Sequence, residues 1–422
     1  MNAPPFDDFE DLGEFPPPLL DEEPCQKHRQ SEPFYDEELR REKLAQVGAV
    51  CSIAATPFAW IDPCTIPRRE FVYGRHLIRQ FVATTVAPGG VGKSSLGVVE
   101  ALAMTSGKAL LGVSVERRLR VWLWNGEDPL EELQRRVMAA AIHYQLQPHD
   151  IDGLFIDSGR VKPIVIGQQS RDGAVIAVPV VEAVKATIRA NKIDVLIVDP
   201  FVSSHQVSEN DNSAIERVAK AWATIADATG CAIDLVHHTR KTGGAEATVE
   251  DGRGASALLS AARSARVLNA MTQDESEKAN VENRRLHFRV DNGKANLAPP
   301  TDQAEWFKLV SVELGNGDQV GVVTTWQWPD PFHDITTDHL RAAQKAVAAG
   351  GPWRENSQAK DWVGIPISGA LGINPDDKAG KKKITSLLKV WIENSMFVRV
   401  TNRDPKRREE KTFIEVGQWA TN

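Results

Sequence analysis

The chain has 422 residues, of which 42% are apolar and 25% charged, and its formal net charge is −7. This balance excludes a protein that coats nucleic acid through an overall basic surface, although it permits a local basic patch. The length and apolar content are sufficient for two or three globular domains.

The cysteine and hydropathy patterns bear on the cellular compartment. The four cysteines are scattered and form no CxxC pair, so we expect free thiols rather than a disulfide framework or a zinc site. No apolar run approaches the roughly 18–20 residues of a membrane span. The acidic, proline-rich start differs from a signal peptide. We therefore expect a soluble, cytoplasmic protein without a membrane partner.

Residues 1–45 are predicted to form a disordered, acidic and proline-rich tail. The first 24 residues contain eight acidic residues, six prolines and no lysine or arginine. Such a segment buries too little apolar surface to offset the entropy lost on ordering. It also contains Phe6, Phe9 and Phe15, so two interpretations stay open: a solvated tail, or a segment that docks on a basic partner.

Short apolar runs alternate with helical stretches through residues 46–330. Strands are predicted at 81–86, 120–124, 194–198 and 231–236, and helices at 93–104, from about 129, and at 213–229. This alternation predicts an α/β domain with a doubly wound, mostly parallel sheet. Three later runs, at 284–290, 304–312 and 319–328, have no long helix between them and are predicted as antiparallel additions.

The composition changes after the proline-containing break at residues 329–331. Helices are predicted at 338–349 and 381–394, followed by strands at 397–400 and 412–416 that flank a charged turn. From residue 376 to the end there are eleven Lys or Arg against seven Asp or Glu. A helix followed by a hairpin with a basic tip predicts a small winged-helix-like domain over residues 335–422.

A glycine-rich loop stands between the first predicted strand and the first predicted helix. Its sequence is Ala87-Pro88-Gly89-Gly90-Val91-Gly92-Lys93-Ser94, followed by Ser95. This is a Walker A pattern with alanine in place of the usual first glycine. The glycines let backbone N–H groups surround phosphate oxygens, the lysine reaches the β and γ phosphates, and Ser94 is a candidate Mg²⁺ ligand. ATP and Mg²⁺ are therefore the expected cofactors.

Two carboxylates follow the next strands of this pattern. Asp199 ends an apolar strand as a Walker B aspartate does, and it would orient a Mg²⁺-bound water. Glu127 follows the strand at 120–124, which we place beside the P-loop strand, and it would hold the water that attacks the γ-phosphate. Alternatively, Glu127 and Asp128 only favour the dipole of the helix that begins near residue 129.

Two adjacent histidines, His237 and His238, end the strand at 231–236. Neighbouring residues of a strand point to opposite faces, so the two side chains do not easily share one metal ion. One of them is placed to sense the γ-phosphate, while an ordinary structural histidine is the alternative.

Together these motifs resemble the RepA-like hexameric replicative helicases of plasmids and phages, within the RecA-like ATPases. The resemblance covers about residues 57–300 and rests on APGGVGKSS, GEDP, IVDP, VHHTRK, RGASALLSAAR and the later Lys294-Ala295-Asn296. It implies that Glu127 is the catalytic base and His238 the γ-phosphate sensor. It also implies that Arg263 is an arginine finger offered to the ATP of a neighbouring subunit. Arg266, three residues farther on the same predicted helical face, is the alternative finger, and an exposed ion pair is the alternative role for both.

An ATP site completed by a neighbour requires a homo-oligomer, and the resemblance implies a hexamer acting on single-stranded DNA. Two loops, at 203–212 and 239–253, are candidates for moving with the state of the nucleotide. The second carries Arg240, Lys241 and Arg253 among glycines, which suits contact with a phosphate backbone. Neither loop contains an aromatic residue, so base stacking is not indicated there.

The sequence thus predicts an ATP-hydrolysing DNA motor, with a replication initiator or a host replication protein as a further partner. The alternative is a DNA-binding regulator in which the C-terminal domain binds a specific sequence and ATP switches assembly. A small-molecule kinase is disfavoured because no substrate lid is recognisable.

Overall fold

The computed structural model describes residues 55–171, 173–239, 246–252, 255–298, 304–330, 332–403 and 410–421. The predicted tail at 1–45 lies outside these residues. The chain divides into two compact units, one ending at Pro67 and the other beginning at Arg68. In the first unit, residues 55–67 contain the short 3-10 helix η1 (Pro63–Thr65), whose first turn is capped by the Asp62 side chain.

Nine strands of the described chain form one large sheet in the second unit. The order is β14-β13-β12-β11-β3-β10-β8-β4-β5. The parallel part contains β11 (Ser264–Ala270), β3 (Val82–Ala87), β10 (Ala232–His238), β8 (Val195–Asp199), β4 (Val121–Asn125) and β5 (Leu154–Ser158). The antiparallel part adds β12 (His287–Ala295), β13 (Glu305–Glu313) and β14 (Gln319–Thr325). The predicted α/β architecture, mostly parallel with antiparallel additions, is confirmed.

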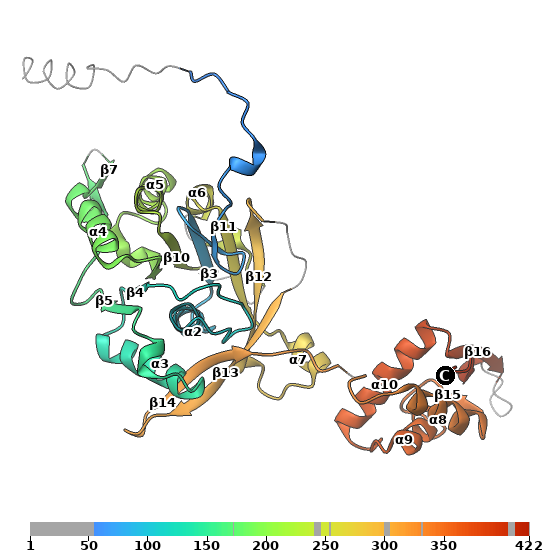
Figure 1. Ribbon diagram of the computed structural model, residues 1–422. Helices are drawn as coiled ribbons and strands as arrows, with labels where there is room; N and C mark the ends of the chain where they lie inside the picture. The colour runs from blue at the N-terminus through green and yellow to red at the C-terminus, as the bar shows by residue number, and fades with distance from the viewer. Residues whose placement is uncertain are drawn as a thin grey trace, which may run out of the picture. The chain divides into compact units, whose positions relative to one another are not determined.

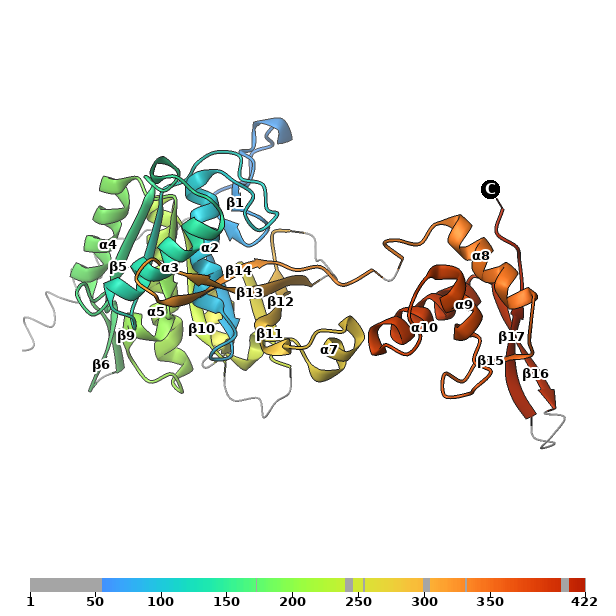
Figure 2. The ribbon, with the colours of Figure 1, turned by 90° about the horizontal axis from the view of Figure 1, so that it is seen from below.

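Helices cover both faces of the parallel part (Figures 1 and 2). On one face lie α2 (Lys93–Ser106) and α3 (Leu130–His143), and on the other lie α4 (Val178–Asn191), α5 (Asn212–Thr229) and α6 (Ala255–Ala261). The sequence of β8 is apolar because both faces of this strand are buried. Val195 and Ile197 enter the core on the α2 side of the sheet, whereas Leu196 and Val198 enter the core on the α5 side. None of the helices in the described ranges is both long and apolar enough to cross a bilayer.

The β13–β14 hairpin lies against the helices of the first face. The Tyr144 hydroxyl, just after α3, donates a hydrogen bond to the Val323 carbonyl of β14 at 2.7 Å. Leu309 of β13 belongs to the same core as α2. Because of this packing, the hairpin reaches the amino-terminal end of α2, where the glycine-rich loop lies.

Smaller elements complete the second unit. They are β1 (Phe71–Tyr73) with β2 (Leu77–Ile78), a three-stranded sheet of β6 (Gly167–Ser170), β7 (Gly173–Ile176) and β9 (His205–Gln206), the helix α7 (Gln273–Ala279), and the 3-10 helices η2 (Pro148–Asp150), η3 (Phe201–Ser204), η4 (Val249–Asp251) and η5 (Arg284–Leu286).

The C-terminal residues pack around a core of their own. The elements are α8 (Thr337–Ala348), β15 (Trp353–Arg354), α9 (Gly364–Leu371), α10 (Lys378–Glu393), β16 (Phe397–Arg403) and β17 (Glu410–Val416). The three strands form a sheet in the order β15-β17-β16. The centre of this core is formed by the buried side chains of Trp362, Leu387, Trp391 and Phe397.

Two details of the predicted arrangement are wrong. The strand before Glu127, β4, does not lie beside the P-loop strand β3, because β10 and β8 stand between them. Arg263 and Arg266 do not share a helix face either, since α6 ends at Ala261 and Arg266 lies within β11.

Candidate nucleotide-binding site

The glycine-rich loop joins β3 to α2 with the backbone that phosphate binding requires. Gly90 and Gly92 have φ angles of +79° and +110°, which favour glycine, and Gly92 is the residue before the first turn of α2. A Cβ atom on Gly92 would lie 3.4 Å from Phe288 and 3.5 Å from Leu309. The free N–H groups of the first turn and the helix dipole create a site for an anion.

A cavity of about 650 Å³ opens over this loop. It is lined by Gly90, Gly92, Lys93, Ser94, Ser95, Glu127, Asp128, Glu132, Arg135, Arg136, Leu309, Asp318, Gln319, Val320 and Gly321. The predicted phosphate-binding residues Gly90 and Gly92–Ser95 and the predicted base Glu127 thus line one space, whose volume is in the range of small-molecule sites. Ala87 ends β3 and is buried beneath the loop.

Asp199 lies at the carboxyl end of β8 and is 3% exposed. Burial raises the pKa of its carboxyl group, and Glu127 acts in the same direction, whereas Lys93 and a hydrogen bond from Ser94 lower it. A buried carboxylate next to a hydroxyl is the oxygen donor set that Mg²⁺ prefers, so these residues fit the ion. Ser94 would bind Mg²⁺ directly and Asp199 through water.

The segment that carries Glu127 is held against the end of β8. The Gly126 N–H donates to the Asp199 carbonyl at 2.8 Å. The Asn125 side-chain oxygen accepts hydrogen bonds from the N–H groups of Glu127 and Asp128 at 2.9 and 2.7 Å. A Cβ on Gly126 would lie 2.2 Å from Cβ of Ser203, so only glycine fits. These bonds fix the backbone of Glu127, while its side chain is exposed to the cavity.

The two histidines at the end of β10 point to different surroundings, as alternation along a strand requires. His238 pairs with Ala87 at the start of the phosphate loop. Burial and Lys93 lower the pKa of His238, whereas Glu127 and Asp199 raise it. His237 is buried instead, with its ring 5.6 Å from that of Phe201 and Nε2 3.8 Å from Glu209. Of the two, His238 is therefore the one near the phosphate site.

A family comparison agrees with this geometry. Residues 49–244 match a family model described as an AAA domain. The chain contains a P-loop ATPase domain. The match includes the phosphate loop, Glu127, Asp199 and His238, and it ends before Arg263. Domains of this kind generally use ATP and Mg²⁺, in agreement with the residues that line the cavity.

Arg263 lies far from the phosphate loop of its own chain. Its N–H donates to the carbonyl of Val82 at 2.8 Å, at the beginning of β3, whereas the loop follows Ala87 at the end. Five residue steps along a strand span roughly 17 Å, which is farther than an arginine side chain extends. Arg263 is exposed at this edge of the sheet, so it is available to another molecule but not to its own ATP site.

Arg266 is buried within β11. It is 7% exposed, and its guanidinium donates to both carboxylate oxygens of Glu100, at 2.6 and 2.7 Å. The idea that Arg266 is the alternative finger, or an exposed ion pair, is therefore wrong, because the side chain is already used in the core. Burial, together with the nearby Arg263, lowers the pKa of Lys294, and its Nζ donates to the Leu259 carbonyl.

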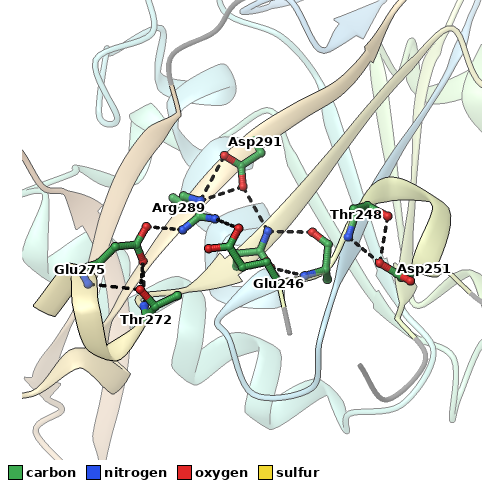
Figure 3. Close-up of polar contacts among 9 residues, drawn as sticks. Glu246, Thr248, Asp251, Thr272, Glu275, Arg289 and Asp291 are labelled. Carbon is green, nitrogen blue, oxygen red and sulfur yellow. Dashed lines mark hydrogen bonds and ion pairs between the residues drawn. The ribbon is translucent and has the colours of Figure 1, made fainter. Parts of the chain in front are cut away.

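The predicted DNA-contacting residues Arg240, Lys241 and Arg253 lie outside the described residues. The ends of their loop meet, since Thr239 and Gly252 form a bridge. The later part of the loop is anchored, because Asn269 exchanges two hydrogen bonds with the Ala247 backbone. Figure 3 shows the second contact, in which Arg289 pairs with Glu246. The other candidate loop, 203–212, is structured at its start, where Ser204 and His205 are buried.

Arg135 and Arg136 of α3 also line the cavity, and the sequence analysis missed them. Arg136 pairs with Asp128 at 2.9 Å and with Glu132 at 3.1 Å, and Arg135 pairs with Asp318 of the β13–β14 turn at 2.7 Å. The spacing of Glu132 and Arg136 on a helix is a local signal. The hairpin that closes this side of the site comes from almost two hundred residues later, so no local pattern marks it.

The buried His205 of β9 predicts a pH effect on stability. His205 is 6% exposed and packs against Phe201, and burial with a contribution from His237 lowers its pKa to about 4. The unfolded chain binds a proton near pH 6.5. Folding is therefore penalised as the pH falls from 6.5 towards 4. Between pH 7.5 and 5 this group removes about 2 kcal/mol of stability.

Urea unfolding at these two pH values tests the effect. His205→Phe retains the ring contact, removes the proton-binding group, and should reduce the loss of stability at pH 5 by about 2 kcal/mol. His333→Phe is the control, because His333 is exposed. Equal losses in wild type and His205→Phe would contradict the prediction.

Proposed function

We propose that this protein is an ATP-hydrolysing, RecA-like DNA motor that works as a ring and resembles the RepA-like replicative helicases. The observation that carries the proposal is the convergence of Glu127, Asp199 and His238 on Lys93. The three groups follow β4, β8 and β10, which are neighbours in the sheet. Parallel strands bring their carboxyl ends to one edge, where the nucleotide would bind.

Each group has a distinct task in this proposal. Glu127 orients the attacking water, and the Lys93 ammonium and the loop N–H groups hold the phosphates. His238 senses whether the γ-phosphate is present, because it pairs with Ala87 at the start of the phosphate loop and Lys93 acts on its pKa. Asp199 and Ser94 hold Mg²⁺, which supplies charge neutralisation when it is bound.

The position of Arg263 supports an oligomer. It is exposed at the edge of the sheet opposite to its own phosphate loop, so an arginine finger here serves a neighbouring copy. A head-to-tail contact of this kind closes into a ring when the rotation allows it. The resemblance favours six subunits around a single strand of DNA, with loop movements driven by γ-phosphate release.

The proposal is tested by measuring ATP hydrolysis with and without single-stranded DNA at low salt. We expect DNA to stimulate the rate regardless of sequence, and the stimulation to fall as salt rises, because phosphate contacts release counterions. Electron microscopy with ATP and Mg²⁺ should show six-membered rings. Absence of stimulation at low salt would remove the DNA motor and leave an ATPase.

Glu127→Gln should bind ATP normally and hydrolyse it at least about a hundredfold more slowly. The amide retains the size and the backbone bonds of the residue but cannot act as a base. Phosphate release and retention of ATP on a filter give the two readouts. Glu131→Gln is the control, because Glu131 is exposed in the first turn of α3 and does not line the cavity. Unchanged turnover in Glu127→Gln would exclude the residue as the base.

A second candidate function is an ATP-switched DNA-binding regulator, and the C-terminal elements favour it. The order α8-β15-α9-α10-β16-β17, with β15 paired to β17, resembles that of a winged helix. On α10, residues 378, 382, 385 and 389 share one face and comprise three lysines and a threonine, while Ile384, Leu387 and Leu388 are buried opposite. A basic helix face suits the phosphates of a duplex.

Full-length variants separate the two functions. Changing Lys378, Lys382 and Lys389 together to Glu should abolish a sequence-specific duplex footprint and leave ATP hydrolysis unchanged if the regulator proposal holds. Lys345→Glu with Lys360→Glu is the control, since both lysines are exposed outside α10. A wild-type chain without duplex sequence preference would rule out this second function.

A further inference from the structure

A buried polar network joins the P-loop strand and the P-loop helix to the neighbouring strands, and the proposed chemistry does not use it. Its members are His76, Thr85, Glu100, Asp234 and Arg266, all between 2% and 7% exposed. They come from the β1–β2 turn, β3, α2, β10 and β11. Buried charges are retained in folded proteins when they are paired and hydrogen-bonded, so the contacts within this network indicate what it holds together.

Arg266 and Asp234 are the centres of the network. The Arg266 guanidinium binds both oxygens of Glu100, and its Nε donates to the Thr85 hydroxyl at 2.9 Å. Thr85 in turn donates to Asp234 at 2.8 Å, and Asp234 lies 3.6 Å from Nη2 of Arg266. His76 reaches Asp234 at 3.3 Å and the Ser264 hydroxyl at 3.0 Å. A continuous set of bonds thus joins α2 to three neighbouring strands.

The charges of the network are fixed by these contacts. His76 and Arg266 lower the pKa of Asp234 in spite of its burial, and burial lowers the pKa of His76. Two carboxylates therefore share one guanidinium beside a neutral imidazole. Apolar residues would stabilise a core at least as well as buried ion pairs. A satisfied polar network instead specifies one relative position of its elements.

Every element of the network except the β1–β2 turn also carries a group of the proposed ATP site. Thr85 is two residues before Ala87, and Glu100 is seven residues after Lys93, or about two turns along α2. Asp234 is four residues before His238, and Arg266 is three residues after Arg263. The network thus connects the phosphate loop on one edge of the sheet with Arg263 on the other.

We propose that Glu100 and Arg266 are positioning residues that fix the Arg263 end of β11 relative to the P-loop helix. This inference rests on the proposed function. In a ring, Arg263 serves the next subunit, so the pair sets the spacing between two successive ATP sites. Its loss would move the finger without touching any group that contacts ATP, and a displacement of about 1 Å is enough to slow a reaction strongly.

The test uses subunits that cannot hydrolyse ATP themselves but can offer Arg263 to a neighbouring subunit. A Lys93→Ala subunit lacks its own ATP site but retains Arg263, so it should restore hydrolysis to Arg263→Ala subunits. We expect the donor Lys93→Ala/Glu100→Gln, or Lys93→Ala/Arg266→Lys, to restore about tenfold less activity. The matched donor Lys93→Ala/Asp150→Asn should restore as much as the parent, because Asp150 is another buried carboxylate paired with an arginine.

Thermal unfolding of each donor separates positioning from instability. Glu100→Gln and Asp150→Asn should both lower the melting temperature, while only the first lowers complementation. Equal complementation by all donors would overturn the inference and leave the proposed motor intact. Failure of the parent pair, in a wild type that hydrolyses ATP, would overturn the role of Arg263 and this inference together. A wild type that does not hydrolyse ATP would instead remove the proposed function.

Discussion

Lys93→Ala should abolish ATP hydrolysis, reducing the rate by at least about a hundredfold. Lys93 is the first residue of α2 and lines the cavity over the phosphate loop. Its ammonium group is the cation that acts on Asp199 and His238. Without it, the γ-phosphate loses a direct partner, and the buried Asp199 carboxyl loses the charge that limits the rise of its pKa. Both effects weaken the bound Mg²⁺–ATP complex.

Steady-state phosphate release and the affinity for a fluorescent ATP analogue measure the two parts of this effect. Lys220→Ala is the control, because Lys220 forms only an exposed pair with Glu216 on α5. Lys93→Arg retains the charge and should recover binding better than turnover, since a guanidinium does not occupy the same place as an ammonium. Normal turnover in Lys93→Ala would mean that the cavity is not the site of hydrolysis.

The groups of the proposed ATP site could be placed together from the sequence because each ends or follows a short apolar strand. Ala87, Glu127, Asp199 and His238 all come at or just after the carboxyl ends of parallel strands, and such ends meet at one edge of a sheet. The order of the strands in the sheet could not be predicted in the same way. Nothing near Glu127 in the chain shows that β10 and β8 separate its strand from β3, because strand order is decided by long-range pairing.

Strand β11 shows where local reasoning fails. The alanine-rich sequence before it favours helix, and α6 does form, but only as far as Ala261. Residues 264–270 become a strand because β3 and β12 pair with them on both sides. The same long-range packing buries Arg266 against Glu100, which lies 166 positions away. No sequence pattern indicates Glu100 as the partner of Arg266. An exposed arginine finger and a buried ion pair therefore cannot be told apart from the sequence alone.

The sequence indicated only the residues of the inner wall of the cavity, which come from the phosphate loop and from Glu127. Its outer wall comes from the β13–β14 hairpin, through Leu309 and the residues from Asp318 to Gly321. The sequence of this hairpin predicts its two strands, but it does not indicate that they pack against α2 and α3. The bonds of Arg135 to Asp318 and of Tyr144 to Val323 decide that position.

Mixing Arg263→Ala with Lys93→Ala chains should restore ATP hydrolysis, although each variant alone is inactive. The first has an intact phosphate loop but no finger to give, and the second has a finger but no ATP site. Arg263 stands at the beginning of β11, beside Val82, and is exposed there. In a ring, an Arg263→Ala subunit becomes active only when its donating neighbour is Lys93→Ala. If sites act independently, an equal mixture should reach about a quarter of the wild-type rate.

The dependence on composition makes this result specific. Activity should be highest near equal amounts of the two chains and fall to zero towards either pure variant. The chain that carries both substitutions is the control and should restore nothing when mixed with Arg263→Ala. No activity at any ratio, with rings still formed, would exclude Arg263 as a finger in trans. Action within one chain would not rescue the proposal, since the length of β3 separates Arg263 from its own phosphate loop.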